Sequence, residues 1–346
     1  MAIRRPVPLN QKKIYVYPIS VNHGFNIFWF FYLFEAKQLV QGLSWSFYDS
    51  SCPTLESIVR KQLQKVFKDD IGQAAGLLRL HFHDCILGGC DASILLAGSA
   101  SGPNDQEAPS NLTLRAQAFR IIDDLSPRDA LFLSGGPNYR VPLGRRDGLN
   151  FATRKETLTN LPPPSSNTSP LLTFLATKNF DRTDVVALSG GHTIGLGHCT
   201  SFTDRLYPTQ DPTMDQNFAN NLRVVCPVAN SSNTNVLDFR SPNTFDNSYY
   251  VDLVNRQGLF TSDQDLYTDR RTWSIVTSFA SNQRLFFERF VISMIKMSQL
   301  NVLTGTQGEI REKCLVRNSD NLSLSSVLKE EKGSWSAFCR LFLFTC

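Results

Sequence analysis

The sequence predicts a mainly α-helical fold with long loops. Apolar residues recur at helical spacing in several segments, whereas runs that alternate like strands are scarce. After about residue 40, no internal repeat or linker divides the chain. With 346 residues, 42% of them hydrophobic and 19% charged, the chain is globular and long enough to bury a large core.

The first predicted helix begins after Pro53-Thr54, since apolar residues from Leu55 to Phe67 follow one helical face. A second helix is predicted from about Asp70 through residues 77–85. The proline-rich stretch 162–167 reads as a loop. Further helices are predicted over 171–177, 182–188 and 273–297. The apolar face of the last one consists of Phe279, Phe286, Phe287, Phe290, Ile295 and Met297.

The charge and the cysteine content limit the function classes. Lys and Arg are scattered along a chain of net charge +4 and pI near 8.6, which does not favour nucleic-acid binding. Eight cysteines together with several N-x-[ST] motifs indicate an oxidising compartment. These motifs begin at Asn111, Asn167, Asn230 and Asn321.

The two ends of the chain are expected to lie outside the folded domain, which we place at residues 41–320. Residues 1–40 contain an apolar run, 27–34, that is shorter than the roughly 20 residues of a membrane span. The run suits a degraded signal peptide, although Glu35 and Lys37 follow it and no small-residue cleavage site is visible. A misassigned first exon is the alternative. Residues 321–346 are interpreted as a tail or a reading-frame artefact.

The stretch LLRLHFHDC, residues 77–85, contains the first candidate chemistry. On a helix, Arg79 and His83 share a face, whereas His81 points elsewhere. A fixed cation beside a neutral imidazole suits heterolysis of a polar bond, because His moves the proton and Arg stabilises the developing anion. The alternative is a structural histidine beside an arginine in an ion pair.

A short loop follows, from Cys85 to Cys90, and a disulfide would close it. Asp84, Asp91 and Ser93 surround this loop, and crowded oxygen ligands of this kind suit a hard cation such as Ca²⁺. A zinc site using the same cysteines with His81 and His83 is the weaker alternative, because the disulfide would remove two ligands.

The second constellation is LSGGHTIG, residues 188–195. His192 follows two glycines, where the backbone can approach a flat ligand closely, so this histidine is a candidate axial haem ligand. A turn histidine is the alternative. A ligand histidine needs a carboxylate on its other ring nitrogen, and Asp263 is a candidate. Another oxygen-rich loop spans residues 238–246.

Together these motifs closely resemble those of the secreted plant haem peroxidases, class III of the plant peroxidase superfamily. The resemblance covers roughly residues 42–321. The matching motifs are FYDSSCP at 47–53, LLRLHFHDC at 77–85, GCDAS at 89–93, VPLGRRDG at 141–148, ALSGGHTIG at 187–195, FDNSYY at 245–250, SDQ at 262–264 and LTGTQGEIR at 303–311.

The resemblance implies one haem b held between a distal and a proximal half of a helical fold. His83 is then the distal acid–base and Arg79 its electrostatic partner. Asn111 orients that histidine, and this role argues against glycosylation of Asn111. His192 is the proximal iron ligand. The remaining implied roles are Phe82 beside the haem, Asp263 as the carboxylate partner of the proximal histidine, and Pro142 at the aromatic-donor site.

Two calcium ions are also implied by the resemblance. The distal site maps to Asp84, Leu87, Gly89, Asp91 and Ser93. The proximal site maps to Thr193, Asp238, Ser241, Thr244 and Asp246. Disulfides are implied between Cys85 and Cys90 and between Cys199 and Cys226. Asp105 stands where the family usually has Glu in the distal network.

The sequence departs from the family after Leu125, where only Ser126-Pro127 joins two segments that a longer helical region normally separates. About twenty residues, or five to six helical turns, are missing. They normally hold two cysteines, so Cys52 and Cys314 are expected to lose their partners.

We therefore weigh three functions. The first is a monomeric haem peroxidase that reduces hydrogen peroxide while oxidising small phenolic donors by one-electron steps. It would be secreted to the extracellular space or cell wall, or directed to the vacuole, with no membrane span. The second is a truncated splice or gene-model product that keeps the motifs but is haem-free or inactive. The third is a zinc- or calcium-binding structural protein of the cell wall.

Overall fold

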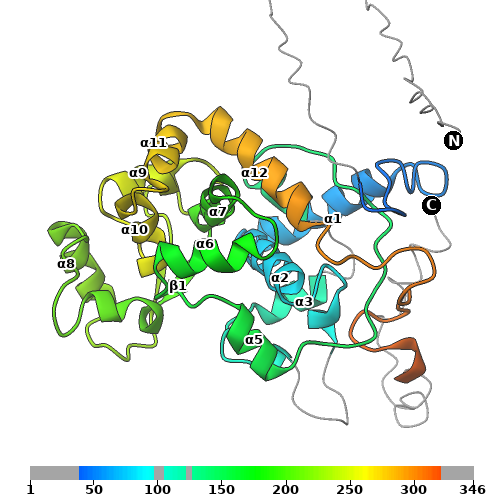
Figure 1. Ribbon diagram of the computed structural model, residues 1–346, viewed down its shortest axis with the longest axis horizontal. Helices are drawn as coiled ribbons and strands as arrows, with labels where there is room; N and C mark the ends of the chain where they lie inside the picture. The colour runs from blue at the N-terminus through cyan, green and yellow to red at the C-terminus, as the bar shows by residue number, and fades with distance from the viewer. Residues whose placement is uncertain (1–38, 97–104, 122–126, 321–346) are drawn as a thin grey trace, which may run out of the picture. The chain divides into compact units, whose positions relative to one another are not determined.

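The computed structural model describes residues 39–96, 105–121 and 127–320 of the chain. These residues form a helical domain, with one small two-stranded sheet (Figure 1). The predicted mainly α fold is therefore confirmed. Residues 1–38 and 321–346, which hold the proposed signal peptide and tail, lie outside the described residues.

The α-helices follow one another with 3-10 turns and loops between them. The α-helices are α1 (Leu55–Asp69), α2 (Gln73–Leu87), α3 (Ala116–Ile121), α4 (Pro127–Leu133), α5 (Arg154–Asn160), α6 (Thr168–Ala176), α7 (Arg182–Ser189), α8 (Gln216–Val225), α9 (Ser248–Val254), α10 (Thr261–Thr268), α11 (Trp273–Ser281) and α12 (Gln283–Met297). The 3-10 turns are η1 (Ser93–Leu95), η2 (Asp105–Glu107), η4 (Gly190–Thr193), η5 (Cys199–Ser201) and η6 (Thr203–Arg205).

The sheet pairs β1 (Leu196–His198) with β2 (Thr234–Val236) in antiparallel register, Gly197 opposite Asn235. It lies directly after the η4 turn. Because Leu196 pairs with Val236, the end of β2 lies beside the start of β1. The oxygen-rich loop at 238–246 follows β2 and therefore begins close to η4.

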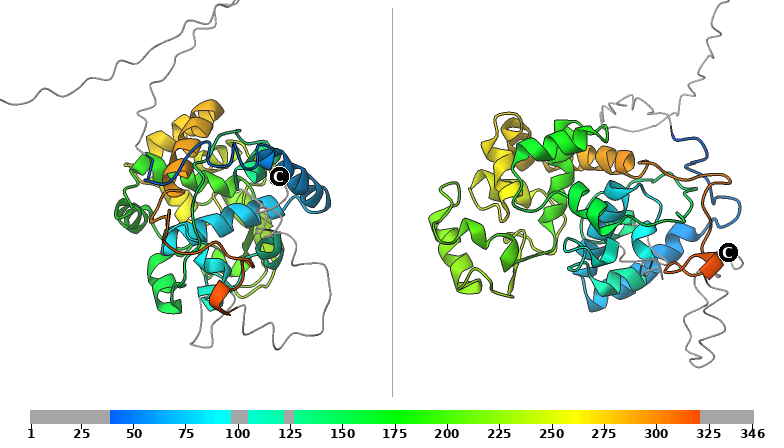
Figure 2. Two further views of the ribbon diagram at one scale, coloured as in Figure 1. Left: turned by 90° about the vertical axis from the view of Figure 1, so that its right-hand side faces the viewer. Right: turned by 60° about the horizontal axis from the view of Figure 1, so that its bottom comes forward.

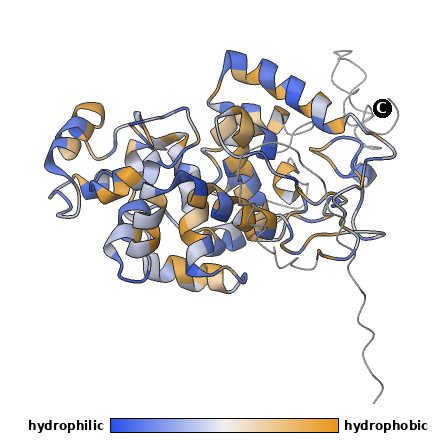
Figure 3. Cartoon of the chain, turned by 90° about the horizontal axis from the view of Figure 1, so that it is seen from above, coloured by the Kyte–Doolittle hydropathy of each residue, from blue (hydrophilic) through white to orange (hydrophobic). Residues whose placement is uncertain are grey.

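The main core lies between α2, α4, α7, α9, α11 and α12, and it buries Leu77, Leu80, Ile86, Phe245, Tyr250 and Phe286 almost completely. Individual helices present apolar residues on one side and polar residues on the other, as Figure 3 shows. Helix α12 packs on α7 and on α2, and so links the two segments that carry the candidate histidines. A second, smaller core surrounds α8 and the disulfide between Cys199 and Cys226.

One predicted helix is wrong in its continuity. The expected helix over 273–297 is broken at Asn282, whose backbone is extended at φ −145° and ψ 88°. The Asn282 side chain accepts a hydrogen bond from Leu285 N at 3.0 Å and so begins α12. The apolar spacing continues across the break because α11 and α12 both pack on the main core.

The two ends of the domain lie together. The Thr304 hydroxyl donates to the Gln41 carbonyl at 2.8 Å, and Val40 N donates to Gln299 Oε1 at 3.1 Å. Figure 2 shows the corresponding blue and orange segments side by side. None of the helices that the structure describes has the length and apolar character needed to span a bilayer.

Candidate active site

Helix α2 carries the first two candidate residues. Leu77, Leu80 and Ile86, each at most 1% exposed, anchor this helix in the core. Arg79 and His83 lie one turn apart on one face, and Arg79 Nε donates to His83 Nε2 at 3.3 Å. The shared face predicted from their spacing is therefore present.

Asn111 sets the protonation of the His83 ring. The Asn111 Nδ2 donates to the Asp105 carbonyl at 2.6 Å, which leaves its Oδ1 as an acceptor facing His83 Nδ1 at 2.6 Å. A carbonyl-type oxygen needs a donor, so Nδ1 carries the proton in the neutral ring. His83 Nε2 is consequently the unprotonated nitrogen, and it accepts a hydrogen bond from Arg79 Nε at 3.3 Å.

The surroundings also keep this ring neutral. Burial and the positive charge of Arg79 lower the pKa of His83 to about 3, against the opposing effect of the Asn111 hydrogen bond. Arg79 itself is fixed through carbonyls, since its Nη1 donates to Thr113 O and its Nη2 to Ser110 O, both at 2.9 Å. The pair is thus a preorganised cation beside an unprotonated base.

The second candidate histidine, His192, lies in η4, directly after α7. Its Nδ1 is 2.7 Å from Asp263 Oδ1 on α10. The same carboxylate accepts from the Tyr249 hydroxyl at 3.0 Å and from Phe260 N at 2.8 Å. Asp263 is therefore held as an acceptor, and His192 Nδ1 donates to it. The lone pair of His192 is left on Nε2, as an axial metal ligand requires.

Glycines bring the His192 segment against α2. A methyl group at Gly191 would lie 3.3 Å from Leu78 Cδ2, and one at Gly195 would lie 3.2 Å from Ala75 Cβ. At Gly190 a methyl group would collide with the Tyr250 hydroxyl and the Phe286 ring. The glycines thus let this segment pack closely on α2, Tyr250 and Phe286, whereas the close approach to a flat ligand stays a prediction.

The loop after α2 carries the residues of the predicted distal calcium site. The structure contains the Cys85–Cys90 disulfide, and Gly89 between them has φ +139°. Asp84 Oδ2 accepts from Ala92 N at 3.1 Å, whereas its buried Oδ1 has no hydrogen-bond partner within the described residues. Burial and the nearby charge of Asp91 raise the pKa of Asp84 to about 8. A hard cation would satisfy this carboxylate.

The predicted proximal oxygen cluster is also assembled. The Thr193 hydroxyl lies 3.0 Å from Asp238 Oδ2 and 3.4 Å from Asp246 Oδ1. The Ser241 hydroxyl bridges the same two carboxylates, 3.5 Å from Asp238 Oδ2 and 3.0 Å from Asp246 Oδ1. Thr193 and Asp238 are fully buried, and burial raises the pKa of Asp238. Two carboxylates converging on hydroxyl groups suit Ca²⁺ as well.

The disulfides decide three expectations about the cysteines. The zinc alternative is wrong, because Cys85 and Cys90 are bonded to each other. The expectation that Cys52 is left without a disulfide partner is wrong, since Cys52 is disulfide-bonded. The disulfide between Cys199 and Cys226 is present, as expected.

The flanking candidates are placed as follows. The Phe82 ring lies 6.0 Å from that of His83, centroid to centroid. Pro142 is buried, and its carbonyl accepts from Arg145 Nη1 at 2.8 Å. Within the described residues, Pro142 shows no hydrogen bond or ring contact to either candidate histidine. Asp105, in place of the usual Glu, is 1% exposed, and burial raises its pKa to about 6.

Sequence reasoning missed the groups that orient the candidate residues. The Asp105 carbonyl, which fixes the Asn111 amide, is a backbone atom and leaves no sequence signal. Tyr249, which donates to Asp263, lies in the motif FDNSYY, but spacing alone does not connect it to position 263.

Comparison with known proteins supports the resemblance. A family model described as peroxidase matches residues 59–127 and 125–282. Peroxidase 12 of Arabidopsis thaliana is 59% identical over 312 residues, covering 84% of this chain and 87% of the relative. The chain belongs to the class III plant peroxidases. Cationic peroxidase SPC4 of Sorghum bicolor is 54% identical over 81% of this peroxidase and 83% of its own length.

The same comparisons are consistent with a segment missing from this peroxidase. The 312 aligned positions with the Arabidopsis relative contain only 84% of 346 residues, or about 291, so about twenty positions of the relative have no counterpart. The family model matches in two pieces that meet at residues 125–127. Both findings agree with the departure noted after Leu125.

Proposed function

We propose that this peroxidase uses haem to reduce hydrogen peroxide while it oxidises phenolic donors in one-electron steps. The observation that carries the proposal is the pairing of two differently prepared histidines. His83 has an unprotonated Nε2 that accepts a hydrogen bond from Arg79, and His192 has an unprotonated Nε2 on the ring that Asp263 holds through Nδ1. The first arrangement suits proton transfer, and the second suits axial ligation of iron.

The residues present fit haem. His192 donates through Nδ1 to a buried carboxylate, and its side chain is 39% exposed, which leaves Nε2 accessible to a ligand. When bound, haem would supply a redox-active iron that exchanges electrons with peroxide and donor. Phe82 would lie beside it, and Asp263 would hold the His192 ring in one orientation and one protonation state.

The protein residues handle the protons and the charge. His83 Nε2 accepts a proton from one oxygen of hydrogen peroxide. It then returns this proton to the other oxygen, which leaves as water. Arg79 stabilises the negative charge that develops as the O–O bond breaks. Overall, one peroxide takes up two electrons and two protons, and two phenols each lose one electron and one proton. The products are two water molecules and two phenoxyl radicals.

Because His83 must be unprotonated to accept the peroxide proton, its role predicts how the rate depends on pH. In the haem-loaded protein, the rate constant for peroxide should stay level as the pH falls from 7 to about 5, because the His83 pKa is lowered to about 3. Arg79→Gln removes one of the two causes of that lowering. Its His83 pKa should rise, so its loss of rate should begin at a higher pH. A stopped-flow pH profile of both proteins checks this, and identical profiles would contradict it.

We also propose that the two oxygen clusters each bind one Ca²⁺. Chelation of calcium should then lower the free energy of unfolding, by about 2–4 kcal/mol per site if calcium stands 100- to 1,000-fold above its dissociation constant. Asp84→Asn should weaken the response to chelator in urea unfolding, whereas the exposed control Asp69→Asn should not. An equal response in all three proteins would rule out the distal site.

Secretion as a monomeric glycoprotein, to the cell wall or vacuole, completes the proposal. The second and third sequons differ from the first, since Asn167 and Asn230 are exposed whereas Asn111 is 3% exposed and bonded through both amide atoms. Glycans are therefore expected at Asn167 or Asn230 and not at Asn111. For the donor site we keep Pro142 only as a family-based proposal, because the residue is buried.

The missing segment favours one alternative, a truncated product that keeps the motifs but is haem-free or inactive. Titration of the purified chain with haem separates the two. A Soret band with peroxide-dependent oxidation of guaiacol supports the peroxidase. A Soret band without turnover would leave only a haem-binding protein, and the absence of a band would favour the truncated product.

A further inference from the structure

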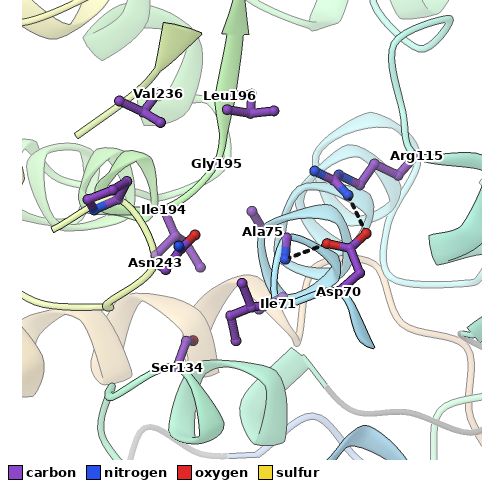
Figure 4. Close-up of a pocket in the computed structure, with 13 residues that line it drawn as sticks. Asp70, Ile71, Ala75, Arg115, Ser134, Ile194, Gly195, Leu196, Val236 and Asn243 are labelled. Atoms are coloured by element: carbon purple, nitrogen blue, oxygen red, sulfur yellow. Dashed lines mark hydrogen bonds and ion pairs between the residues drawn. The ribbon is translucent and has the colours of Figure 1, made fainter. Parts of the chain in front are cut away.

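A cleft of about 180 Å³ lies between the start of α2 and the segment that follows His192. Apolar side chains from both segments line it, including Ile71, Ala75, Ile194 and Leu196 (Figure 4). Its charged lining residues are Asp70 and Arg115. The cleft is thus a mainly apolar space with one cation and one anion at its edge.

Gly72, the N-cap residue of α2, and Gly76 within the helix leave the space in which Arg115 lies. A methyl group at Gly72 would be 2.6 Å from Arg115 Nη2, and one at Gly76 would be 3.0 Å from Arg115 Cδ. Both positions lie on one face of α2, a single turn apart. Any larger residue there would push the guanidinium out of its groove.

The guanidinium is only partly used by the protein. Arg115 Nη1 donates to Asp70 Oδ2 at 2.9 Å, which is its one hydrogen bond within the described residues. Arg115 has five N–H donors, so Nε and Nη2 remain for a ligand. Both side chains are partly exposed, 35% for Arg115 and 42% for Asp70, so solvent weakens their ion pair.

The groove is in line with the candidate haem site. Gly72, Gly76, Arg79 and His83 follow one another along the same face of α2. At 1.5 Å per residue, Gly76 lies about 10 Å and Gly72 about 16 Å from His83 along the helix axis. On the other side of the cleft, Gly195 touches Ala75 three residues after His192. Arg115 therefore lies on the helix face that carries Arg79 and His83, beside the segment that carries His192.

We propose that Arg115 binds a propionate carboxylate of haem in this cleft. Arg115 itself lies in the groove that Gly72 and Gly76 leave open. The inference rests on the proposed haem peroxidase function. Arginine suits the role because its planar fork can donate two parallel hydrogen bonds to one carboxylate. The apolar lining then covers the adjoining edge of the macrocycle, and Asp70 keeps Arg115 in place without using all its donors.

The test compares haem with haem dimethyl ester, in which both propionates are uncharged. Each is titrated into the apo form of the wild type, Arg115→Gln, Arg115→Lys and the control Arg284→Gln, with the Soret band as the readout. Arg284 is an exposed arginine on α12 that also forms an ion pair. Arg115→Gln should weaken haem binding about tenfold and ester binding less than twofold. Arg115→Lys should fall between, and the control should match the wild type.

A second variant acts without removing the charge. Gly72→Ala displaces the guanidinium, so it should weaken haem more than the ester, as Arg115→Gln does. Equal losses for haem and ester, or no loss for either, would overturn the assignment. A wild type without any Soret band would overturn the haem peroxidase function as well, which distinguishes the two failures.

A carboxylate could also come from a small organic acid, and benzoate serves as the probe for that source. It is titrated into the haem-loaded wild type and Arg115→Gln. If haem binding is unchanged in Arg115→Gln while benzoate binding is lost, the cleft holds a free acid and the propionate assignment is wrong. Benzoate binding that does not depend on Arg115, together with selective loss of haem affinity, supports it.

Discussion

Replacing His83 by leucine should slow the reaction of the haem-loaded protein with hydrogen peroxide by roughly 10²–10⁴-fold. The leucine cannot accept the peroxide proton or return it to the leaving oxygen. Arg79 would remain, but neutral hydrogen peroxide is a poor nucleophile without a base. Its O–O bond also breaks heterolytically only slowly when no proton is delivered to the leaving oxygen. Stopped-flow absorbance in the Soret region, with peroxide varied and donor absent, measures this rate constant.

The matched control is His81→Leu. His81 lies two residues earlier on α2, and its ring nitrogens are 3.7 and 3.8 Å from the Cys85 sulfur. Burial and the charge of Arg145 lower the His81 pKa to about 3, as burial and Arg79 do for His83, but only His83 contacts Arg79 and Asn111. His81→Leu should leave the peroxide rate within a few-fold of the wild type. Similar losses in both variants would show that His83 acts only through packing.

Restoring the missing segment should produce the second large effect, an increase of several kcal/mol in the free energy of unfolding. About twenty additional helical residues would bury apolar surface that contributes about 25 cal/mol per Å². In the present chain, α4 begins at Pro127 and is held by charged contacts to α1, with Arg128 Nη1 2.8 Å from Glu56 and Arg60 Nη2 3.2 Å from Asp129. Phe132 on the same helix is 37% exposed beneath Arg60.

The experiment inserts the corresponding segment of the Arabidopsis relative after Leu125 and compares urea unfolding of the two chains by circular dichroism. The denaturant midpoint and the m-value should both rise, because more surface becomes buried on folding. A Gly/Ser insert of equal length serves as the control and should raise neither. An unchanged midpoint with the natural segment would mean that the shortened chain has already compensated for the loss.

Much of the site was predictable because its residues act through local spacing. Arg79 and His83 share a helix face by virtue of a four-residue separation, and the Cys85–Cys90 loop closes over five residues. The motif around His192 was predictable for a similar reason, since paired glycines mark a close backbone approach. Sequence patterns are reliable where one short segment determines the geometry.

The rest depends on contacts between distant segments. The pairing of His192 with Asp263 needs η4 and α10 to lie together, which spacing did not select without the family resemblance. Arg115 gave no signal, because its position is set by the absence of side chains at Gly72 and Gly76. The break at Asn282 was missed because the apolar period continues through it, although an asparagine before a helix is a recognised N-cap signal.

The most direct test of the central claim is the electron balance of the shortened chain itself. The haem-loaded protein is mixed with a known, limiting amount of hydrogen peroxide and an excess of a simple phenol, and the phenol consumed is measured. We predict two phenols oxidised per peroxide, with the rate strongly reduced in His83→Leu. Haem binding without phenol consumption, or consumption that does not depend on His83, would contradict the account.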